Sequence, residues 1–443
     1  MEVLIENILI YAVVLIFCAV VVIIYLRKQK RESKAVEQKI AQAKEEGLHE
    51  PVSLHPVVNV NRCIKTGACI TACPEKDILG IRNGKATTIN ASRCVGHGAC
   101  FHACPTEAIT LCIGTEERGV ELPHVDKNFQ TNVPGIYIAG ELGGMGLIKN
   151  AVEQGKQAVE NMLKAIKMGH NADYDLVIVG AGPAGISGSL TAKKLGLKFV
   201  TLEQDTLGGT VFTFPRSKIV MTSAMELPLH GKVSLQETSK SELLNLWHEV
   251  LGKNEIEVRE KTKVEQIIPE DGIFIVKTSQ GDEISTRRIL LSIGRRGTPR
   301  KLNVPGEESE KVAYRLLEPE EISGKDILVV GGGDSAIESA LLLADQNKVT
   351  LSYRREKFSR LKSKNQQKIS EAIEQGRVDI KFETNVSEIK SQEVLLTNGK
   401  PDEPIRLRND LVYIFAGGEL PTQFLEKSGI RITKKFGEAL LKH

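Results

Sequence analysis

The feature that most constrains this chain is a glycine-rich turn between two apolar runs in residues 175–203, DLVIVGAGPAGISGSLTAKKLGLKFVTLE. The turn reads Gly180-x-Gly182-x-x-Gly185, a helix-compatible stretch follows, and the second apolar run ends at Glu203. The three glycines allow a tight turn, a close backbone approach to a pyrophosphate and close packing of helix on strand. The helix N-terminus then faces the phosphates, and Glu203 can bind ribose hydroxyls. The pattern predicts a unit for the ADP half of a dinucleotide, with an unrelated glycine-rich turn as the alternative.

A second unit of the same kind occupies residues 326–355. An apolar run leads into Gly331-x-Gly333-x-x-Ala336, and the strand after the helix ends at Arg354 and Arg355. An NAD site has an acid at this strand end, whereas arginines can bind a 2′-phosphate bidentately. The sequence therefore predicts NADPH rather than NADH, with two solvated arginines as the alternative.

The cysteines are distributed unevenly. Seven of the eight lie between Cys63 and Cys112, Cys18 stands apart, and residues 113–443 contain none. A disulfide framework would staple the loops of a small secreted domain, whereas clustered thiols in a chain of this length indicate metal. The 59 basic and 56 acidic side chains leave a net charge of +3, too balanced to indicate a nucleic-acid partner.

The clustered cysteines form an internal repeat. One copy reads Cys63-IKTGA-Cys69-ITA-Cys73-Pro74, and the other, 31 residues later, reads Cys94-VGHGA-Cys100-FHA-Cys104-Pro105. Both runs resemble the C-x2-C-x2-C-x3-C-P run of the bacterial two-cluster ferredoxins, in which the last cysteine of each run ligates the other cluster. The resemblance implies a module with one cluster on Cys63, Cys69 and Cys104 and another on Cys94, Cys100 and Cys73. A degenerate ferredoxin fold without metal is the alternative.

Both runs depart from the ferredoxin pattern at one position. The second cysteine of the family is Thr66 in the first copy and His97 in the second. Thr66 is a poor iron ligand, so we expect a three-iron cluster, or a four-iron cluster with a labile corner, at that site. His97 is a candidate iron ligand that could instead only line the site. Cys112 lies on the strand after the second run, and we expect it to serve packing.

An apolar segment near the N-terminus predicts a single membrane span. Residues 8–26, ILIYAVVLIFCAVVVIIYL, carry no charge, and at about 1.5 Å per residue they reach roughly 28 Å. A cleaved signal peptide is the alternative, but the segment follows acidic Glu2 and Glu6 and ends in the basic run 27–31 rather than at a small-residue cleavage site. The basic run predicts that everything downstream lies in the cytoplasm. A charged, helix-prone stalk is expected after it.

Residues 131–162, TNVPGIYIAGELGGMGLIKNAVEQGKQAVENM, form a strand, a glycine-rich turn and a helix that lie early in the chain. They resemble the last FAD-binding segment of the thioredoxin-reductase-like flavoproteins, with Gly140 and Glu141 in place of the family's Gly-Asp. In that family the segment closes the chain, but here it precedes the first glycine motif. The resemblance therefore implies a circular permutation, and a short independent strand–helix hairpin is the alternative.

Further turns match the same flavoproteins. The resemblance implies that Gly209 and Thr210 lie against the isoalloxazine ring, and that Gly417, in the run DLVYIFAGGELPT, lies near the flavin. The run YRREKFSR at 353–360 resembles the NADPH-recognition stretch of thioredoxin reductases. The resemblance to this superfamily covers residues 116–443.

We therefore expect an α/β chain with two Rossmann-like three-layer nucleotide-binding domains, a small α+β ferredoxin module and one N-terminal transmembrane helix. The expected segments are an anchor (1–28), a charged helical stalk (29–56), the two-cluster module (57–114), the permuted FAD-binding segment (116–168), the FAD-binding domain (172–298), the NAD(P)-binding domain (299–409) and an FAD-domain return segment (410–443).

The parts together predict a membrane-bound flavoprotein oxidoreductase of the cytoplasmic face. Its cofactors would be FAD, NADPH and two iron–sulfur clusters of the 3Fe-4S or 4Fe-4S type, and they rather than a catalytic side chain would carry the redox chemistry. Electrons would pass between NADPH and a redox partner protein or small acceptor, in either direction, and a homodimer is possible. The alternatives are direct flavin reduction of a low-molecular-weight disulfide, as in flavoproteins resembling bacillithiol disulfide reductases, and a redox or iron sensor. A dithiol relay is excluded by the absence of cysteine from 113–443.

Overall fold

The computed structural model describes residues 2–45, 49–51, 54–75, 77–94, 96–144, 146–165, 172–212, 219–221, 224–234, 237–295, 298–358, 361, 363–399, 403–419 and 421–441. The last two residues of the run YRREKFSR lie outside them. The chain forms two compact units, residues 1–120 together with 435–443, and residues 121–434.

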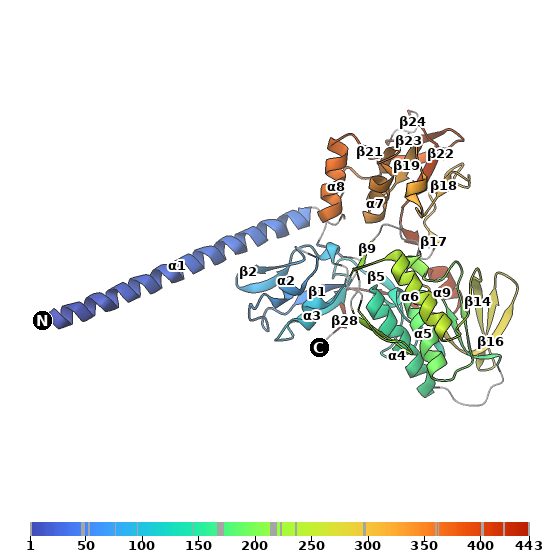
Figure 1. Ribbon diagram of the computed structural model, residues 1–443, viewed down its shortest axis with the longest axis horizontal. Coiled ribbons are helices and arrows are strands. Elements are labelled where there is room, and N and C mark those ends of the chain that lie inside the picture. Colours follow the sequence, from blue (N-terminus) through green and yellow to red (C-terminus); the bar gives the residue numbers. More distant parts are fainter. Residues whose placement is uncertain are drawn as a thin grey trace. The chain divides into compact units, whose positions relative to one another are not determined.

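The first unit begins with the long helix α1 (Glu2–Glu45) (Figure 1). Within the described residues it is the one helix that is long and apolar enough to cross a membrane. Its apolar side chains from Leu9 to Leu26 are exposed. Among the described residues of the unit, no helix or strand covers these side chains, so lipid can surround them.

The second half of α1 packs against the rest of the unit. Its less exposed residues recur every three or four positions and so lie on one helix face. They are Gln29, Ser33, Val36, Ile40 and Ala43. The expected charged stalk is therefore, in its helical part, an amphipathic helix with one covered face.

A hairpin lies under this helix face. It consists of β2 (Leu79–Arg82) and β3 (Lys85–Thr88). Ser33 and Asn83 exchange two hydrogen bonds of 3.0 and 3.1 Å, and Lys39 forms an ion pair with Asp77. A Cβ atom at Gly80 would lie 2.9 Å from a Val36 methyl group, so only glycine lets the helix approach the hairpin this closely.

The cysteine repeat lies in the same unit. Its antiparallel sheet has the order β1–β4–β28, with β1 at Leu54–Val58, β4 at Ile109–Ile113 and β28 at Glu438–Leu441. Two short helices, α2 (Ala68–Ala72) and α3 (Ala99–His102), follow the first part of each cysteine run, and the turn η1 (Ala91–Arg93) precedes the second run. Cys112 of β4 is buried between His55 and Ala439 of the neighbouring strands.

The first domain of the second unit is a twisted sheet covered by helices (Figure 1). Its strand order is β13–β8–β7–β16–β15–β14, with β6 also beside β16. The parallel strands are β6 (Ile136–Ile138), β7 (Tyr174–Val179), β8 (Phe199–Leu202) and β13 (Val258–Arg259), while β14 (Val264–Glu270) and β15 (Ile273–Thr278) join the long β16 (Glu283–Leu291) antiparallel. The helices α4 (Ile148–Ala165), α5 (Pro183–Lys194) and α6 (Lys240–Lys253) pack together beside the sheet.

The early segment 131–162 is part of this sheet. Ile136 of β6 is paired in parallel with Ile289 of β16, and α4 lies against α5. The strand β6 is buried over its whole length, so it could not form a separate hairpin without exposing apolar surface. This is the arrangement that the circular permutation predicts.

The second domain of this unit has its own parallel sheet, of order β18–β25–β19–β20–β21. The strands are β18 (Val312–Ala313), β19 (Asp326–Val330), β20 (Lys348–Tyr353), β21 (Val378–Phe382) and β25 (Leu411–Ile414), and the helices are α7 (Asp334–Leu343) and α8 (Ser363–Glu374). An antiparallel sheet of β22 (Asn385–Ile389), β23 (Glu393–Thr397) and β24 (Ile405–Arg408) packs with it.

The boundary after this domain differs from the expected return segment at 410–443. The strand β25 belongs to the second domain's sheet because its apolar residues pair with β19 and are buried there. The return begins later, with α9 (Thr422–Lys427), whose Leu425 joins the core of the first domain. The residues from 435 onward belong to the first unit.

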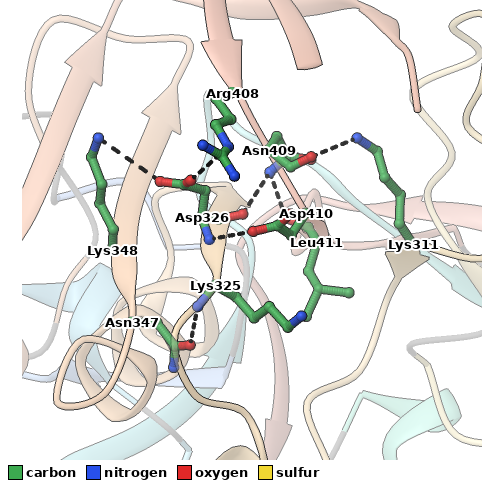
Figure 2. Close-up of polar contacts among 9 residues, drawn as sticks. All are labelled: Lys311, Lys325, Asp326, Asn347, Lys348, Arg408, Asn409, Asp410 and Leu411. Atoms are coloured by element: carbon green, nitrogen blue, oxygen red, sulfur yellow. Dashed lines mark hydrogen bonds and ion pairs between the residues drawn. The ribbon is translucent and has the colours of Figure 1, made fainter. Parts of the chain in front are cut away.

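Figure 2 shows the polar contacts that hold β19 and β25 together where both strands begin. The Asp410 carboxylate accepts a hydrogen bond of 2.8 Å from the amide of Asp326. The buried Asn409 donates to the carbonyls of Asp326 and Leu411, and its own carbonyl accepts from Lys311. Lys348 and Arg408 flank the Asp326 carboxylate. These contacts give hydrogen-bond partners to the first residues of both strands, at the end of the sheet opposite the glycine turn.

Short elements connect the larger ones. They are β5 (Val120–Pro123), η2 (Glu141–Gly143), η3 (Gly209–Val211), β9 (Ile219–Met221), β10 (Met225–Leu227), β11 (Gly231–Val233), β12 (Glu237–Ser239), β17 (Thr298–Pro299), η4 (Pro319–Glu321), β26 (Gly418–Glu419) and β27 (Ile432–Lys435).

Candidate cofactor and cluster sites

The two cysteine runs adopt the same local conformation. Gly67 and Gly98 precede α2 and α3 with φ angles of 74° and 77°. This left-handed conformation costs glycine little, and it turns the chain so that the following cysteine enters a short helix. The repeat in the sequence is therefore a repeat in structure.

Three cysteines of the predicted first cluster line one pocket. Cys63 and Cys69 line a small pocket that is open to solvent, and Cys104 of the second run lines the same pocket. Burial raises the pKa of the Cys69 thiol, and the neighbouring Cys104 and Cys63 raise it further. The structure thus brings together the three residues that the ferredoxin pattern assigns to one cluster, from both runs.

The predicted second group is Cys73, Cys94 and Cys100. Burial raises the pKa of Cys100 to about 12, and the nearby Cys94 and Cys73 contribute to this shift. Burial likewise raises the pKa of Cys94 to about 11, with a contribution from Cys73. Such buried, mutually repelling thiols are stabilised as thiolates by a metal, which neutralises them.

Backbone amides point at several of the sulfurs. The amide of Ala86 donates to Cys63 Sγ at 3.3 Å, and the amide of Ala108 donates to Cys104 Sγ at 3.2 Å. In the second group the amide of Gly96 donates to Cys94 Sγ at 3.4 Å. Hydrogen bonds of this kind stabilise a thiolate and tune the potential of a cluster that it ligates.

The two positions without cysteine lie in different surroundings. Thr66 is exposed at the rim of the first pocket, and its hydroxyl accepts a weak hydrogen bond of 3.4 Å from the amide of Ala68. His97 is half-buried. No group of three His, Cys, Asp or Glu among the described residues is arranged to hold a single metal ion.

The first glycine motif forms the expected tight turn between strand and helix. Gly180 has φ 100°, and a Cβ there would lie 2.6 Å from the carbonyl oxygen of Ser292. A Cβ at Gly185 would lie 1.9 Å from the carbonyl oxygen of Gly180, so helix and strand touch at this point. Beside Gly182, at the N-terminus of α5, there is open space within 4 Å. This space and the helix terminus fit a pyrophosphate.

Glu203 lies at the end of β8, buried next to the same turn. Its carboxylate accepts hydrogen bonds from the amides of Ala181 at 2.7 Å and Asp205 at 3.0 Å. Burial raises the pKa of the Glu203 carboxyl, although these two amides act in the opposite direction. The carboxylate is thus held at the mouth of the turn, where it can take ribose hydroxyls.

Two further predicted flavin contacts come close to this turn. Gly209 lies against Gly182, with 3.3 Å between its Cβ position and the Gly182 Cα atom, and Thr210 follows it in η3. Gly140 donates its amide to Gln154 at 2.8 Å, and a Cβ there would meet Ala184 at 3.2 Å. The permuted segment and the first glycine motif therefore form one site.

Arg295 is a residue of this site that the sequence analysis missed. Burial lowers the pKa of its guanidinium, and the neighbouring Glu141 opposes this effect. Glu141, where the family has Asp, thus has a cation nearby. The signal in the sequence was Arg295 after the strand and turn ILLSIG, but its proximity to Glu141 depends on the fold.

The second glycine motif repeats the geometry of the first. A Cβ at Gly331 would lie 2.6 Å from the carbonyl oxygen of Phe415, Ala336 is buried in α7, and the surroundings of Gly333 are open. Arg354 and Arg355 are exposed just after β20. Their positions, at the strand end beside the helix N-terminus, fit the 2′-phosphate of NADPH.

Gly417 lies in the connection between the two domains. Its φ is 90°, and its carbonyl accepts a hydrogen bond of 2.9 Å from the amide of Arg300. The surroundings of its Cβ position are open. That Gly417 lies near the flavin stays a prediction.

Comparisons with known proteins agree with this organisation. Residues 177–442 match the pyridine nucleotide-disulphide oxidoreductase family, and residues 55–105 match a 4Fe-4S dicluster domain. The chain is 26% identical over 267 residues to a bacilliredoxin reductase of Bacillus subtilis, covering 59% of this chain and 82% of the relative. It is 29% identical over 185 residues to a ferredoxin–NADP reductase of Ignicoccus hospitalis, covering 42% of this chain and 57% of the relative. The chain thus spans little more than half the length of the ferredoxin–NADP reductase of Ignicoccus hospitalis.

The fold is also that of solved structures. A bacillithiol disulfide reductase from Bacillus cereus superposes with a TM-score of 0.53 and 23% identity, over 61% of this chain and 85% of that chain. Together with the sequence matches, this confirms the resemblance inferred from the motifs. The chain belongs to the pyridine nucleotide-disulphide oxidoreductases, and is a flavoprotein oxidoreductase joined to a 4Fe-4S dicluster domain.

Proposed function

We propose that this chain is a membrane-anchored, NADPH-dependent oxidoreductase that carries electrons between NADPH, FAD and two iron–sulfur clusters, to or from a separate redox partner. The observation that carries the proposal is the distribution of thiols. Six cysteines lie in two groups of three in one unit, and none follows residue 112. A nicotinamide domain without cysteine has no dithiol to pass electrons on, whereas the cysteine groups fit one-electron carriers.

The chain's own residues bind and orient the cofactors. The N-terminus of α5 beside Gly182 would face the FAD pyrophosphate, and Glu203 would take the adenosine ribose. The N-terminus of α7 beside Gly333 would face the NADPH pyrophosphate, and the two arginines after β20 would bind its 2′-phosphate. When bound, these cofactors and the clusters supply hydride transfer and one-electron transfer.

In the cluster module, the chain's role is to hold the thiolates and set the potential. Cys63, Cys69 and Cys104 would hold one cluster, and Cys73, Cys94 and Cys100 the other. The amides that point at the sulfurs would raise the potential by stabilising negative charge. A three-iron cluster is proposed for the group beside Thr66, because its hydroxyl is a weak iron ligand.

A single membrane span is proposed for the apolar part of α1. Its exposed apolar residues and the four basic residues within 27–31 support an anchor with the rest of the chain on the cytoplasmic side. The partner would then be a redox protein or small carrier at that membrane.

An anaerobic NADPH titration of the purified protein, followed by optical and EPR spectroscopy, tests the electron path. We expect the flavin absorbance to fall first and cluster EPR signals to change as further NADPH is added. A flavin that is fully reduced while iron-loaded clusters keep their oxidised spectra would contradict the proposed path.

Direct reduction of a low-molecular-weight disulfide is the second candidate. It is favoured by the similarity to the bacilliredoxin reductase of Bacillus subtilis. Because the flavin domains lack cysteine, the disulfide would have to react at the flavin itself. NADPH oxidation that depends on added bacillithiol disulfide, and that persists after the clusters are removed by chelation, would select this candidate.

A further inference from the structure

One contact joins the first cluster pocket to the end of the apolar helix segment. Lys65 lies in the loop between Cys63 and Cys69, and its Nζ donates a hydrogen bond of 3.4 Å to the Tyr25 hydroxyl. The same ammonium group lies 5.4 Å from the centre of the Tyr25 ring. Tyr25 is the penultimate residue of the apolar segment 8–26. The cluster loop therefore lies level with the point where that segment ends.

This level is maintained by further contacts along α1. Ser33 bonds to Asn83, and Val36 packs over Gly80, both on the hairpin of the module. Because an α-helix is stiff over this length, the contacts of Ser33 and Val36, about two and three turns beyond Tyr25, prevent the module from sliding along it. The height of the cluster loop relative to the apolar segment is thus set by the fold of one unit.

The loop that contains Lys65 exposes both large apolar and basic side chains. We define the docking loop as residues 57–67. Among the described residues between 49 and 120, the exposed large apolar side chains all fall in this loop: Val57, Val60 and Ile64, which are 45%, 53% and 64% exposed. Arg62 is exposed between them, and α1 adds Arg27, Lys28, Lys30 and Arg31 near the same level.

From this juxtaposition we propose that the docking loop lies on an anionic phospholipid surface when residues 8–26 span the bilayer; the inference rests on the proposed anchor. Tyrosine at the end of a span lies at the lipid–water boundary. Apolar side chains at that depth enter the boundary between headgroups and acyl chains, and nearby arginine and lysine are attracted to anionic headgroups. The docking loop presents both kinds of residue at that depth.

The position has a consequence for electron transfer. Ile64, Lys65 and Thr66 line the same pocket as Cys63 and Cys69. A cluster held there would lie beside the membrane surface, with its incomplete Thr66 corner close to lipid. A redox partner within the bilayer could then exchange electrons directly with this cluster.

The test uses the full chain in vesicles of phosphatidylcholine and phosphatidylglycerol at a ratio of three to one. The photoreactive residue p-benzoylphenylalanine replaces one side chain at a time: Ile64 in the docking loop, Leu15 in the apolar segment, or Lys44 as the matched exposed control. Lys44 lies on the same helix, about 28 Å beyond Tyr25. After illumination, covalent phospholipid adducts are measured by mass spectrometry.

We expect adducts at positions 15 and 64 and at least tenfold fewer at position 44. Adducts at position 15 with a yield at 64 no higher than at 44 would overturn the docking inference and leave the anchor intact. Absence of adducts at position 15 would overturn the anchor itself, and the docking inference with it. In vesicles of phosphatidylcholine alone we expect the yield at 64 to fall severalfold and the yield at 15 to stay unchanged; an unchanged yield at 64 would overturn the assignment to an anionic surface.

Discussion

Gly155 of α4 lies directly against Ala184 of α5, so closely that a Cβ at Gly155 would fall 2.0 Å from the Ala184 carbonyl oxygen. The two residues belong to helices on either side of the permutation point. Their contact brings the permuted segment to the helix that begins at the first phosphate-binding turn. The flavin site is therefore built from both segments.

Replacing Gly155 with alanine should disrupt this contact. We expect Gly155→Ala to lower the free energy of unfolding by about 3 kcal/mol, because the backbone at Ala184 cannot move aside without disturbing α5. Gly252→Ala is the matched control, since a Cβ there has open space in α6 and should raise stability by about 0.5–1 kcal/mol. Thermal unfolding of both variants measures the difference. Equal stability of the two would show that α4 and α5 do not approach this closely.

Substitutions at the middle glycine of each motif, Gly182 or Gly333, should affect the binding of FAD and NADPH separately. In Gly182→Ala the added methyl group has room in the protein but occupies the space assigned to the FAD pyrophosphate, so we expect a folded protein with little flavin. In Gly333→Ala we expect normal flavin content and a KM for NADPH raised at least tenfold. Flavin absorbance and NADPH kinetics distinguish the two. Loss of flavin in Gly333→Ala, or its full retention in Gly182→Ala, would contradict the assignment.

Nucleotide choice should depend on the two arginines after β20. The double variant Arg354→Ala with Arg355→Ala loses charge-assisted hydrogen bonds of about 1.5–3 kcal/mol, which corresponds to roughly ten- to a hundredfold in discrimination. We expect kcat/KM for NADPH to fall by this factor while that for NADH stays the same. Arg406→Ala, an exposed arginine of the same domain, is the control. An unchanged NADPH to NADH ratio in the double variant would reject the 2′-phosphate site.

The position of the missing cysteine should decide the cluster type. In Thr66→Cys the fourth thiolate of the ferredoxin spacing is restored at the rim of the first pocket, so we expect the three-iron EPR signal of aerobically isolated protein to be lost in favour of a stable four-iron cluster. His97→Ala should alter the EPR spectrum of the second cluster only if His97 is a ligand. Two oxygen-stable four-iron clusters in the unaltered protein would show that another group completes the first site.

Shortened chains should separate the two roles of α1. Removal of residues 1–28 should release the protein from membranes while leaving the covered helix face in place. Removal of residues 1–49 should also uncover the hairpin beneath Val36 and destabilise the module, with loss of iron. Sedimentation and iron content measure the two effects. A full chain that stays in the soluble fraction, or equal iron content in both shortened forms, would contradict this division.

The parts of this fold that sequence could predict are those with short-range signals. Gly180, Gly182 and Gly185 lie five residues apart or less, and Gly180 and Gly185 have the tight turn and the close helix–strand contact that their spacing predicts. The two expected cysteine groups were predicted from the identical spacing of the cysteines in the two copies of the repeat. In the glycine turn and in the cysteine runs, the residues that matter are close in sequence and adopt a single local backbone conformation.

Features that depend on distant contacts were not predictable in the same way. Arg295 approaches Glu141 only because β6 is inserted beside β16, more than a hundred residues later in the chain. The apolar sequence of β25 is compatible with a place in either sheet, because it does not indicate which strand lies beside it. The covered face of α1 was not predictable because this part of the helix is highly charged, and because its buried residues Ser33 and Ala43 are not strongly apolar.

The strand β28 has a consequence for the biosynthesis of this protein. It pairs with β4, yet it leaves the ribosome roughly 300 residues later, after the whole flavin unit. At about 5–20 residues per second, β4 would wait tens of seconds for its second neighbour. Iron delivered during that interval would meet a module in which β4 still has an unpaired edge, so the sheet of the cluster module is completed only when translation of the chain is nearly finished.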